Sequence, residues 1–159
     1  MWHELKYKQM KRYLLILFFG FSVSIFAQNT IIVSKKELKV MVVNSSSDTL
    51  CSFRCAAGRN KGDKKYLDDR RTPEGTFSVA SIEDSRNWKY EGKVPHVYGP
   101  YFIRIRMPKW TGIGIHGTNV PSSIGRRCSK GCIRLKNTDI VQLVRYVSVG
   151  DKVLIEKDV

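Results

Sequence analysis

The chain has 159 residues, of which 42% are hydrophobic, enough for one globular domain with a core of its own. It carries 28 Lys and Arg against 14 Asp and Glu, and the resulting net charge of +14 favours polyanionic surroundings. The composition excludes a disordered chain and a bundle of membrane helices, and since no nucleic-acid-binding motif is present, no nucleic-acid partner is expected.

The first 27 residues have the pattern of a secretory signal peptide. A basic stretch, residues 6–12, precedes an apolar run of 15 residues from Tyr13 to Ala27, shorter than the roughly 20 residues of a membrane-spanning helix. We expect cleavage after Ala27, which leaves residues 28–159 as the mature domain without a stable membrane span. A retained anchor is the alternative to cleavage, and Met10 is an alternative start of translation.

The first predicted elements form a hairpin. Apolar and polar residues alternate over residues 38–42, which predicts a strand, and residues 50–57 predict a second strand. The turn-forming run 44–48 joins them through a longer loop. The charged, glycine-containing residues 58–69 are expected to form a loop, and residues 75–82 a third strand.

Residues 85–100 hold several aromatic residues, two glycines and two prolines without a clear period, which indicates a long, ordered loop. We interpret this loop as a candidate lid over the functional site. Residues 101–107 alternate again and predict a strand with every second side chain, from Tyr101 onwards, on one face. Residues 112–116 predict a short strand that ends at His116.

One helix is predicted near the C-terminus. Its apolar face follows the i, i+3, i+4, i+7 pattern: Ile140, Leu143, Val144 and Val147. Asn137 or Thr138 is expected to cap the N-terminus of this helix. Residues 152–155 predict a last strand, so the chain as a whole reads as a mostly β domain with one clear helix.

Two segments supply an imidazole and a thiol, namely His116-Gly117-Thr118 and Ser-Lys-Gly-Cys-Ile-Arg-Leu at residues 129–135. Cysteine attacks as the thiolate, so Cys132 needs a neighbouring base or positive charge. His116 is the expected base, because the other histidine after residue 27, His96, lies in a loop that matches nothing catalytic. Basic residues gather around the cysteine: Arg126, Arg127, Lys130, Arg134 and Lys136.

At these residues the chain resembles a known family, the bacterial L,D-transpeptidase catalytic domain of the YkuD type. The family signature is a His-Gly pair and, after a gap of about this length, Ser-His-Gly-Cys followed by Ile-Arg-Leu or Ile-Arg-Met. Residues 71–77, 98–104 and 112–116 also read like the family, so that the resemblance covers nearly all of the chain after residue 30. One position departs from the pattern, because Lys130 stands where the family usually has His.

The resemblance implies a β-sandwich of mixed sheets with one principal C-terminal helix. It also implies a triad in which Cys132 is the nucleophile, His116 the base, and a backbone carbonyl at or near Gly117 the group that orients the imidazole. The N–H groups of Gly131 and Cys132 are expected to meet the developing oxyanion. Arg134 would hold a substrate carboxylate by a two-pronged hydrogen bond. The expected substrate-binding residues are Arg134, Ser129, Gly131 and Tyr98.

By this resemblance the chain is expected to be an exported peptidoglycan L,D-transpeptidase in the periplasm or at the cell wall. Cys132 would form a thioester with a tetrapeptide stem, release D-alanine and pass the acyl group to an amine, giving a 3→3 cross-link. Transfer to water would instead make an L,D-carboxypeptidase, and transfer to a protein lysine would anchor that protein. A wall-peptide cysteine peptidase and, because of Lys130, an inactive wall-binding module are further alternatives. No metal or organic cofactor is implied, carbapenems are expected to acylate Cys132, and the oligomeric state stays open.

The other cysteines are Cys51, Cys55 and Cys128, and an oxidising compartment would permit disulfides. On one extended strand Cys51 and Cys55 would lie about 13 Å apart, beyond the roughly 7 Å that a disulfide allows, so they are not expected to pair. A Cys55–Cys128 pair stays open, as does a Cys128–Cys132 bridge that would disable the nucleophile. A zinc site is not expected, because the spacing is unsuitable and the site would consume Cys132.

Overall fold

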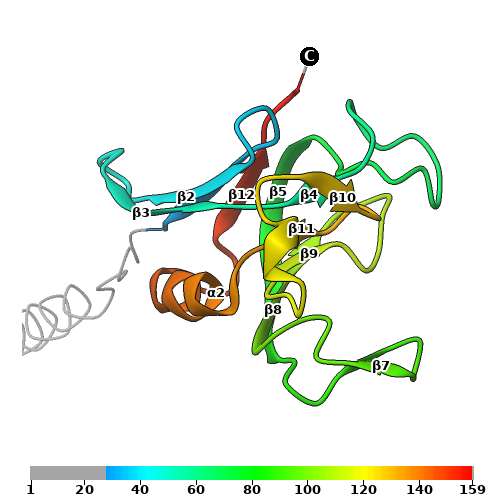
Figure 1. Cartoon of the computed structure of the whole chain (residues 1–159). Coiled ribbons are helices and arrows are strands. Elements are labelled where there is room, and N and C mark those ends of the chain that lie inside the picture. The colour runs from blue at the N-terminus through cyan, green and yellow to red at the C-terminus, as the bar shows by residue number, and fades with distance from the viewer. Residues whose placement is uncertain (1–27, 159) are drawn as a thin grey trace, which may run out of the picture.

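The computed structural model describes residues 28–158, a mostly β chain with one α-helix in that range (Figure 1). The expected signal peptide lies outside the described residues. The strands are β1 (Thr30–Ser34), β2 (Lys39–Val43), β3 (Thr49–Arg54), β4 (Ala57–Gly58), β5 (Gly75–Asp84), β6 (Lys89–Tyr90), β7 (Val94–Pro95), β8 (Tyr101–Arg106), β9 (Gly114–His116), β10 (Arg127–Ser129), β11 (Ile133–Arg134) and β12 (Lys152–Ile155). The helical elements are α2 (Asn137–Leu143) and the 3₁₀ turns Pro121–Ser123 and Val144–Tyr146.

Eight strands form one sheet in the order β11-β9-β8-β5-β12-β1-β2-β3. The β1–β12 and β9–β11 pairs are parallel, while the other neighbours in this sheet are antiparallel. Two short two-stranded sheets, β10-β4 and β6-β7, accompany it. The predicted fold class, mainly β with mixed sheets and one principal C-terminal helix, is therefore confirmed.

The large sheet curls until its two ends meet. Ala56 follows β3 at one end of the sheet and Arg134 lies in β11 at the other, and the two residues exchange backbone hydrogen bonds of 2.8 and 2.9 Å. This pairing satisfies backbone groups that an open sheet would leave at its edges. It also fixes β11, the strand that follows Cys132, against the segment between β3 and β4.

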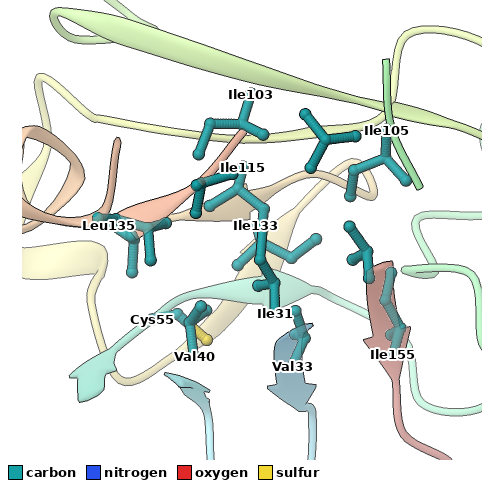
Figure 2. Close-up of a cluster of buried hydrophobic side chains, with 14 of the residues drawn as sticks. Ile31, Val33, Val40, Cys55, Ile103, Ile105, Ile115, Ile133, Leu135 and Ile155 are labelled. Atoms are coloured by element: carbon teal, nitrogen blue, oxygen red, sulfur yellow. The ribbon is translucent and has the colours of Figure 1, made fainter. Parts of the chain in front are cut away.

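The hydrophobic core lies inside the curl. Figure 2 shows side chains from β8, β9 and β11 facing side chains from β1, β2 and β12 across the interior. Successive residues of a strand point to opposite faces, so the alternating residues Ile31 and Val33 of β1, and Ile103 and Ile105 of β8, all reach this core. The sheet thus has an inner face for packing and an outer face that is free to carry a site.

The predicted strands are present as β2, β3, β5, β8, β9 and β12. The strand expected over residues 50–57 divides into β3 and β4, because the chain leaves the sheet edge after Arg54 and pairs with β10 and Arg134. The expected loop 85–100 contains the hairpin β6–β7, with Glu91 and Gly92 at positive φ in its turn. β1 was not predicted from the sequence: it is a short, continuously apolar run, which lacks the alternation of a half-exposed strand.

Helix α2 carries part of the predicted apolar face, because Ile140 and Leu143 are fully buried, whereas Val144 belongs to the following 3₁₀ turn. The prediction of a cap from Asn137 or Thr138 is wrong. The N-cap residue is Lys136, without a side-chain capping bond among residues 28–158. The Asn137 amide oxygen instead accepts a hydrogen bond of 2.9 Å from the backbone N–H of Thr118. This tertiary contact occupies the oxygen that would otherwise cap the helix.

Candidate active site

Strand pairing brings the imidazole and the thiol together. β9 and β11 run parallel at the centre of Figure 1, with Ile115 opposite Ile133 and His116 opposite Arg134. Because side chains alternate along a strand, Ile115 and Ile133 both enter the core and are fully buried. His116 and Arg134 therefore emerge on the outer face, the same face as Cys132, which lies two residues before Arg134.

A pocket of about 460 Å³ opens on this outer face. Its floor includes His116, Cys132 and Arg134, and two segments form its walls. The first wall comes from residues 58–74, through Lys64, Leu67 and Asp68, and the second wall comes from residues 85–100, through Trp88, Tyr90, Val97 and Tyr98. The full lining is Lys64, Leu67, Asp68, Trp88, Tyr90, Val97, Tyr98, Phe102, Arg104, Thr111, Gly112, Ile113, His116, Ser129, Lys130, Cys132 and Arg134.

The His116 imidazole is 3% exposed and is held by two kinds of contact. Its Nδ1 lies 2.6 Å from the carbonyl oxygen of Gly117, and since a carbonyl only accepts, Nδ1 carries the proton and Nε2 is left with a free lone pair. The ring of Phe102 stacks on the imidazole at a centroid distance of 5.3 Å, and the ring of Tyr98 meets it edge-on at 5.1 Å. Burial lowers the pKa of His116 to about 4, and the nearby charge of Arg134 acts in the same direction.

The Cys132 thiol is half-buried and donates to the carbonyl oxygen of Gly112 at 3.4 Å. Burial raises the pKa of the Cys132 thiol, although the positive charges of Arg134 and Arg104 act against this rise. With the pKa of His116 lowered and that of Cys132 raised, both groups are neutral near pH 7. The pocket is therefore lined by a neutral thiol and by a neutral imidazole whose Nε2 is free to accept a proton.

The turn before Cys132 is held by its own hydrogen bonds. The Ser129 hydroxyl donates to the carbonyl of Cys132 at 2.6 Å and accepts from the N–H of Gly131 at 3.1 Å. In this structure the N–H of Gly131, which the sequence suggested as a donor to the oxyanion, donates to Ser129. Gly131 has φ of 143°, a conformation that favours glycine, and a Cβ there would lie 3.0 Å from the carbonyl oxygen of Arg71.

Arg134 and Tyr98, both expected to bind substrate, line the pocket. The Nε of Arg134 is buried and has no hydrogen-bond partner among residues 28–158. Burial also raises the pKa of Tyr98, which keeps its phenol protonated. The structure thus gathers every residue that the sequence suggested for the site: Cys132, His116, Gly117, Arg134, Ser129, Gly131 and Tyr98.

Lys130, the departure from the family pattern, points to the hairpin wall of the pocket. Its Nζ donates to the Tyr90 hydroxyl at 2.6 Å and lies 3.9 Å from a Glu91 carboxylate oxygen. Sequence reasoning missed Tyr90, as well as Phe102 and Thr72. Thr72 is buried and its hydroxyl donates to the carbonyl of Gly131 at 2.8 Å, a contact across 59 residues that no local pattern signals.

The four cysteines all lie in the described part of the chain, and all are free thiols. The Cys55–Cys128 and Cys128–Cys132 pairs that the sequence left open are thus unbonded in this structure. Between residues 28 and 158, His, Cys, Asp and Glu side chains do not gather in threes in a way that would suit a metal ion. Within the same range the helices are too short or too polar to cross a bilayer.

Comparison with known proteins places this chain in a family. The sequence model of the L,D-transpeptidase catalytic domain, YkuD, matches residues 28–155. The chain therefore belongs to the L,D-transpeptidase catalytic domain family, as its sequence motifs predicted.

Among individual relatives, the L,D-transpeptidase YkuD of Bacillus subtilis is 42% identical over 87 residues, which are 55% of this chain and 46% of that protein. The chain spans about half the length of the curated relatives that it matches first. The helical cell shape determining protein Pgp2 from Campylobacter jejuni has a similar fold, with a TM-score of 0.68 and 19% identity over 83% of this chain and 48% of that one. So does L,D-transpeptidase 3 from Mycobacterium tuberculosis in complex with a faropenem-derived adduct, with a TM-score of 0.63 and 18% identity over 82% and 61% of the two chains.

Proposed function

We propose that the chain is an exported peptidoglycan L,D-transpeptidase in which Cys132 is the nucleophile. One observation carries this proposal: neighbouring parallel strands present Cys132 and His116 to one pocket, with the imidazole oriented by the carbonyl of Gly117. A base whose far nitrogen is held by an acceptor is the arrangement that nucleophilic acyl transfer requires. Membership of the L,D-transpeptidase catalytic domain family supplies the reaction class.

The first half of the reaction forms a thioester. The Cys132 sulfur attacks the carbonyl between the third residue of a tetrapeptide stem and its terminal D-alanine, while Nε2 of His116 takes the thiol proton. The N–H of Cys132 would donate to the oxyanion, and Arg134, which lines the pocket, would bind a stem carboxylate. Collapse of the tetrahedral intermediate breaks the peptide bond, and His116 passes its proton to the departing amine of D-alanine.

The second half transfers the acyl group. An amine from another stem attacks the thioester and loses a proton to His116, and the Cys132 thiolate that leaves recovers a proton from the imidazolium. The product is a 3→3 cross-link, and the enzyme returns to its starting protonation state. If water replaces the amine, the same steps release a tripeptide, so the acceptor alone distinguishes transpeptidase from carboxypeptidase.

The pKa values set the pH dependence of acylation. The pKa of His116 is about 4 because of its burial, so the imidazole is unprotonated and able to accept a proton above that pH. We expect the acylation rate to fall only as pH drops through about 4, and to stay high near pH 6, where an exposed histidine would already be largely protonated. Acylation rates measured from pH 3.5 to 8, with folding checked at each pH, test this expectation.

Intact-protein mass spectrometry tests the nucleophile. The full chain is incubated with faropenem, and separately with the carbapenem imipenem, beside the variants Cys132→Ala and Cys128→Ala. Cys128 is a matched control because it is also half-buried and belongs to the same segment. We expect one adduct on the native chain and on Cys128→Ala, and none on Cys132→Ala. An adduct on Cys132→Ala, or a folded native chain without any adduct, would contradict the proposal.

The same samples distinguish the acceptors. Incubation with a purified tetrapeptide stem, followed by mass analysis of the products, yields cross-linked stems if an amine is the acceptor and tripeptides alone if water is. Cross-linked product supports the transpeptidase. Tripeptide alone would replace it with the carboxypeptidase. Processing after Ala27 is tested by N-terminal sequencing of the secreted protein, where retention of residues 14–26 would contradict export by a cleaved signal.

A further inference from the structure

A single peptide group lies behind the catalytic imidazole. Its carbonyl belongs to Gly117 and accepts the Nδ1 proton of His116 at 2.6 Å. Its N–H belongs to Thr118 and donates to the side-chain oxygen of Asn137 at 2.9 Å. The two ends of one planar unit are therefore held by two different side chains, His116 on one side and Asn137 on the other.

The Asn137 oxygen is enclosed by main chain. A Cβ placed on Gly117 would lie 2.4 Å from Asn137 Oδ1, and one placed on Gly99 would lie 2.3 Å from the same atom. The two glycines also touch each other, since a Cβ on Gly99 would lie 2.6 Å from the Cα of Gly117. Only glycine leaves room at both positions, so the close approach of Asn137 to this peptide is built into the backbone.

Asn137 has no evident task in its own helix. It is the first residue of α2, but the cap position is Lys136, and the Asn137 oxygen accepts from Thr118, which lies 19 residues earlier and just beyond the end of β9. Asn137 as a whole is exposed. A residue that buries nothing in the core and does not cap its helix contributes chiefly through this one hydrogen bond.

The geometry points to Asn137 as a positioning residue for the catalytic base, acting through the Gly117–Thr118 peptide. Without the bond to Thr118, this peptide would be free to tilt, and the Gly117 carbonyl would move away from Nδ1. The bond also polarises the peptide, because hydrogen bonds in a chain strengthen one another. Asn137 thus joins Cys132, His116 and Gly117 as a fourth member of the catalytic arrangement. This inference rests on the proposed role of His116 as the base.

The groups that face His116 define what else could influence its protonation. Arg134 provides a positive charge, Cys132 and Tyr98 are neutral near pH 7, and Phe102 covers one face of the ring. An aspartate at position 137 would keep an oxygen acceptor for Thr118 and would add a negative charge behind the peptide. An alanine would remove the acceptor. The two changes therefore affect His116 in different ways.

The first experiment measures the imidazole itself. The full chain is labelled with ¹⁵N-histidine, and the His116 signal is assigned by its loss in His116→Gln. We expect native His116 to be the Nδ1–H tautomer at pH 7, and Asn137→Ala to show a mixture of the two tautomers. Thr138→Ala is the matched control: Thr138 is the next residue of the same helix, and its hydroxyl bonds to Asp139. This readout needs no substrate, so it stands apart from the transpeptidase proposal.

The second experiment measures acylation by faropenem against pH. Asn137→Ala is expected to slow acylation by about 10- to 100-fold, in line with other small misplacements of catalytic groups. Asn137→Asp is expected to react within about threefold of the native rate at pH 7, with its acid limb moved up by about one pH unit. Thr138→Ala is expected to match the native chain throughout.

The outcomes separate the two proposals. Asn137→Ala with the native tautomer and the native acylation rate would overturn the positioning role, whether or not the chain is a transpeptidase. A tautomer change in Asn137→Ala, in a chain that faropenem does not acylate, would keep the positioning role and overturn the proposed function. If Asn137→Ala does not fold, Asn137→Asp decides the matter, since an unchanged His116 titration there would also overturn the role.

Discussion

The two walls of the catalytic pocket are held in different ways. The first wall, residues 58–74, is tied by ion pairs removed from water: Lys64 to Asp69 at 2.8 Å, with side chains 4% and 0% exposed, and Lys35 to Glu74 at 2.7 Å. In the second wall, residues 85–100, the hairpin β6–β7 is tied by an exposed contact. Its Glu91 carboxylate lies 3.9 Å from Lys130, and both side chains are about two-thirds exposed, at 68% and 65%.

This contrast determines which wall is able to move. Breaking a buried ion pair leaves an unpaired charge away from water, whereas an exposed pair exchanges its partner for water at little cost. The first wall also reaches the catalytic turn, because the Thr72 hydroxyl donates to Gly131. The second wall touches that turn through Lys130 alone among the bonds described for β6 and β7. We infer that the first wall is a fixed support for the nucleophile and that the hairpin β6–β7 is the movable one.

The largest expected effect comes from removing one acid that forms an ion pair with a residue of each wall. Asp69 is buried and accepts from the Lys64 ammonium and from the backbone N–H groups of Lys65 and Arg71. Burial alone would raise the pKa of Asp69, but these bonds outweigh burial and hold the pKa well below its usual range. Asp69→Ala is expected to cost about 3–5 kcal/mol in the free energy of unfolding, because Lys64 is left unpaired.

The matched change for the second wall is Asp84→Ala. Asp84 is the last residue of β5, and its exposed carboxylate pairs with Arg86 of that wall. Chemical denaturation should show no measurable loss for this variant. Equal losses in the two variants would show that the walls do not differ as described. A loss in Asp69→Ala that disappears when Lys64 is also replaced by Met would identify the unpaired lysine as the cause.

A second test removes the hydrogen bond that joins the first wall to the turn before Cys132. Thr72 is 1% exposed, accepts from the N–H of Gly58 at 2.9 Å and donates to the carbonyl of Gly131. Thr72→Val keeps the shape but leaves both backbone groups unpaired, so we expect a loss of about 1–3 kcal/mol in the free energy of unfolding. Acylation should slow as well, because Gly131 is no longer held. Thr72→Ser, which restores the hydroxyl, should recover both, and a failure to recover would argue against the hydrogen bonds.

The first wall also shows why part of the site could be predicted and part could not. The Ser-Lys-Gly-Cys segment and the His-Gly pair are local patterns, so Cys132 and His116 could be read from the sequence. Their adjacency depends on the parallel pairing of β9 with β11, which the sequence did not reveal. Thr72 lies in a recognised segment, but its contact with Gly131 joins distant parts of the chain. The strands β2, β5 and β12 were predictable because half of each faces the core.

Asn137 shows most clearly where prediction from the sequence fails. Its position before a helical pattern predicted a cap, which is the usual use of Asn there. In the structure its side-chain oxygen instead accepts a hydrogen bond from the N–H of Thr118, because the curl of the sheet brings the end of β9 to the start of α2. The hairpin β6–β7 was also missed, because its strands are two residues long and one of them contains Pro95. Short elements such as these are set by their tertiary neighbours rather than by a period.

The smallest expected effect concerns the movable hairpin β6–β7 of the second wall. Lys130→Ala removes the bond to Tyr90 and leaves every buried contact in place. We expect no measurable change in the midpoint of thermal unfolding, but faster amide hydrogen exchange over residues 88–95, because the hairpin then opens more often. Lys89→Ala, a change at an exposed lysine of the same hairpin, is the control and should leave exchange unchanged. Equal exchange in the two variants would mean that Lys130 does not restrain the hairpin. Faster exchange in Lys130→Ala alone would show that this lysine holds the movable hairpin to the turn that carries Cys132.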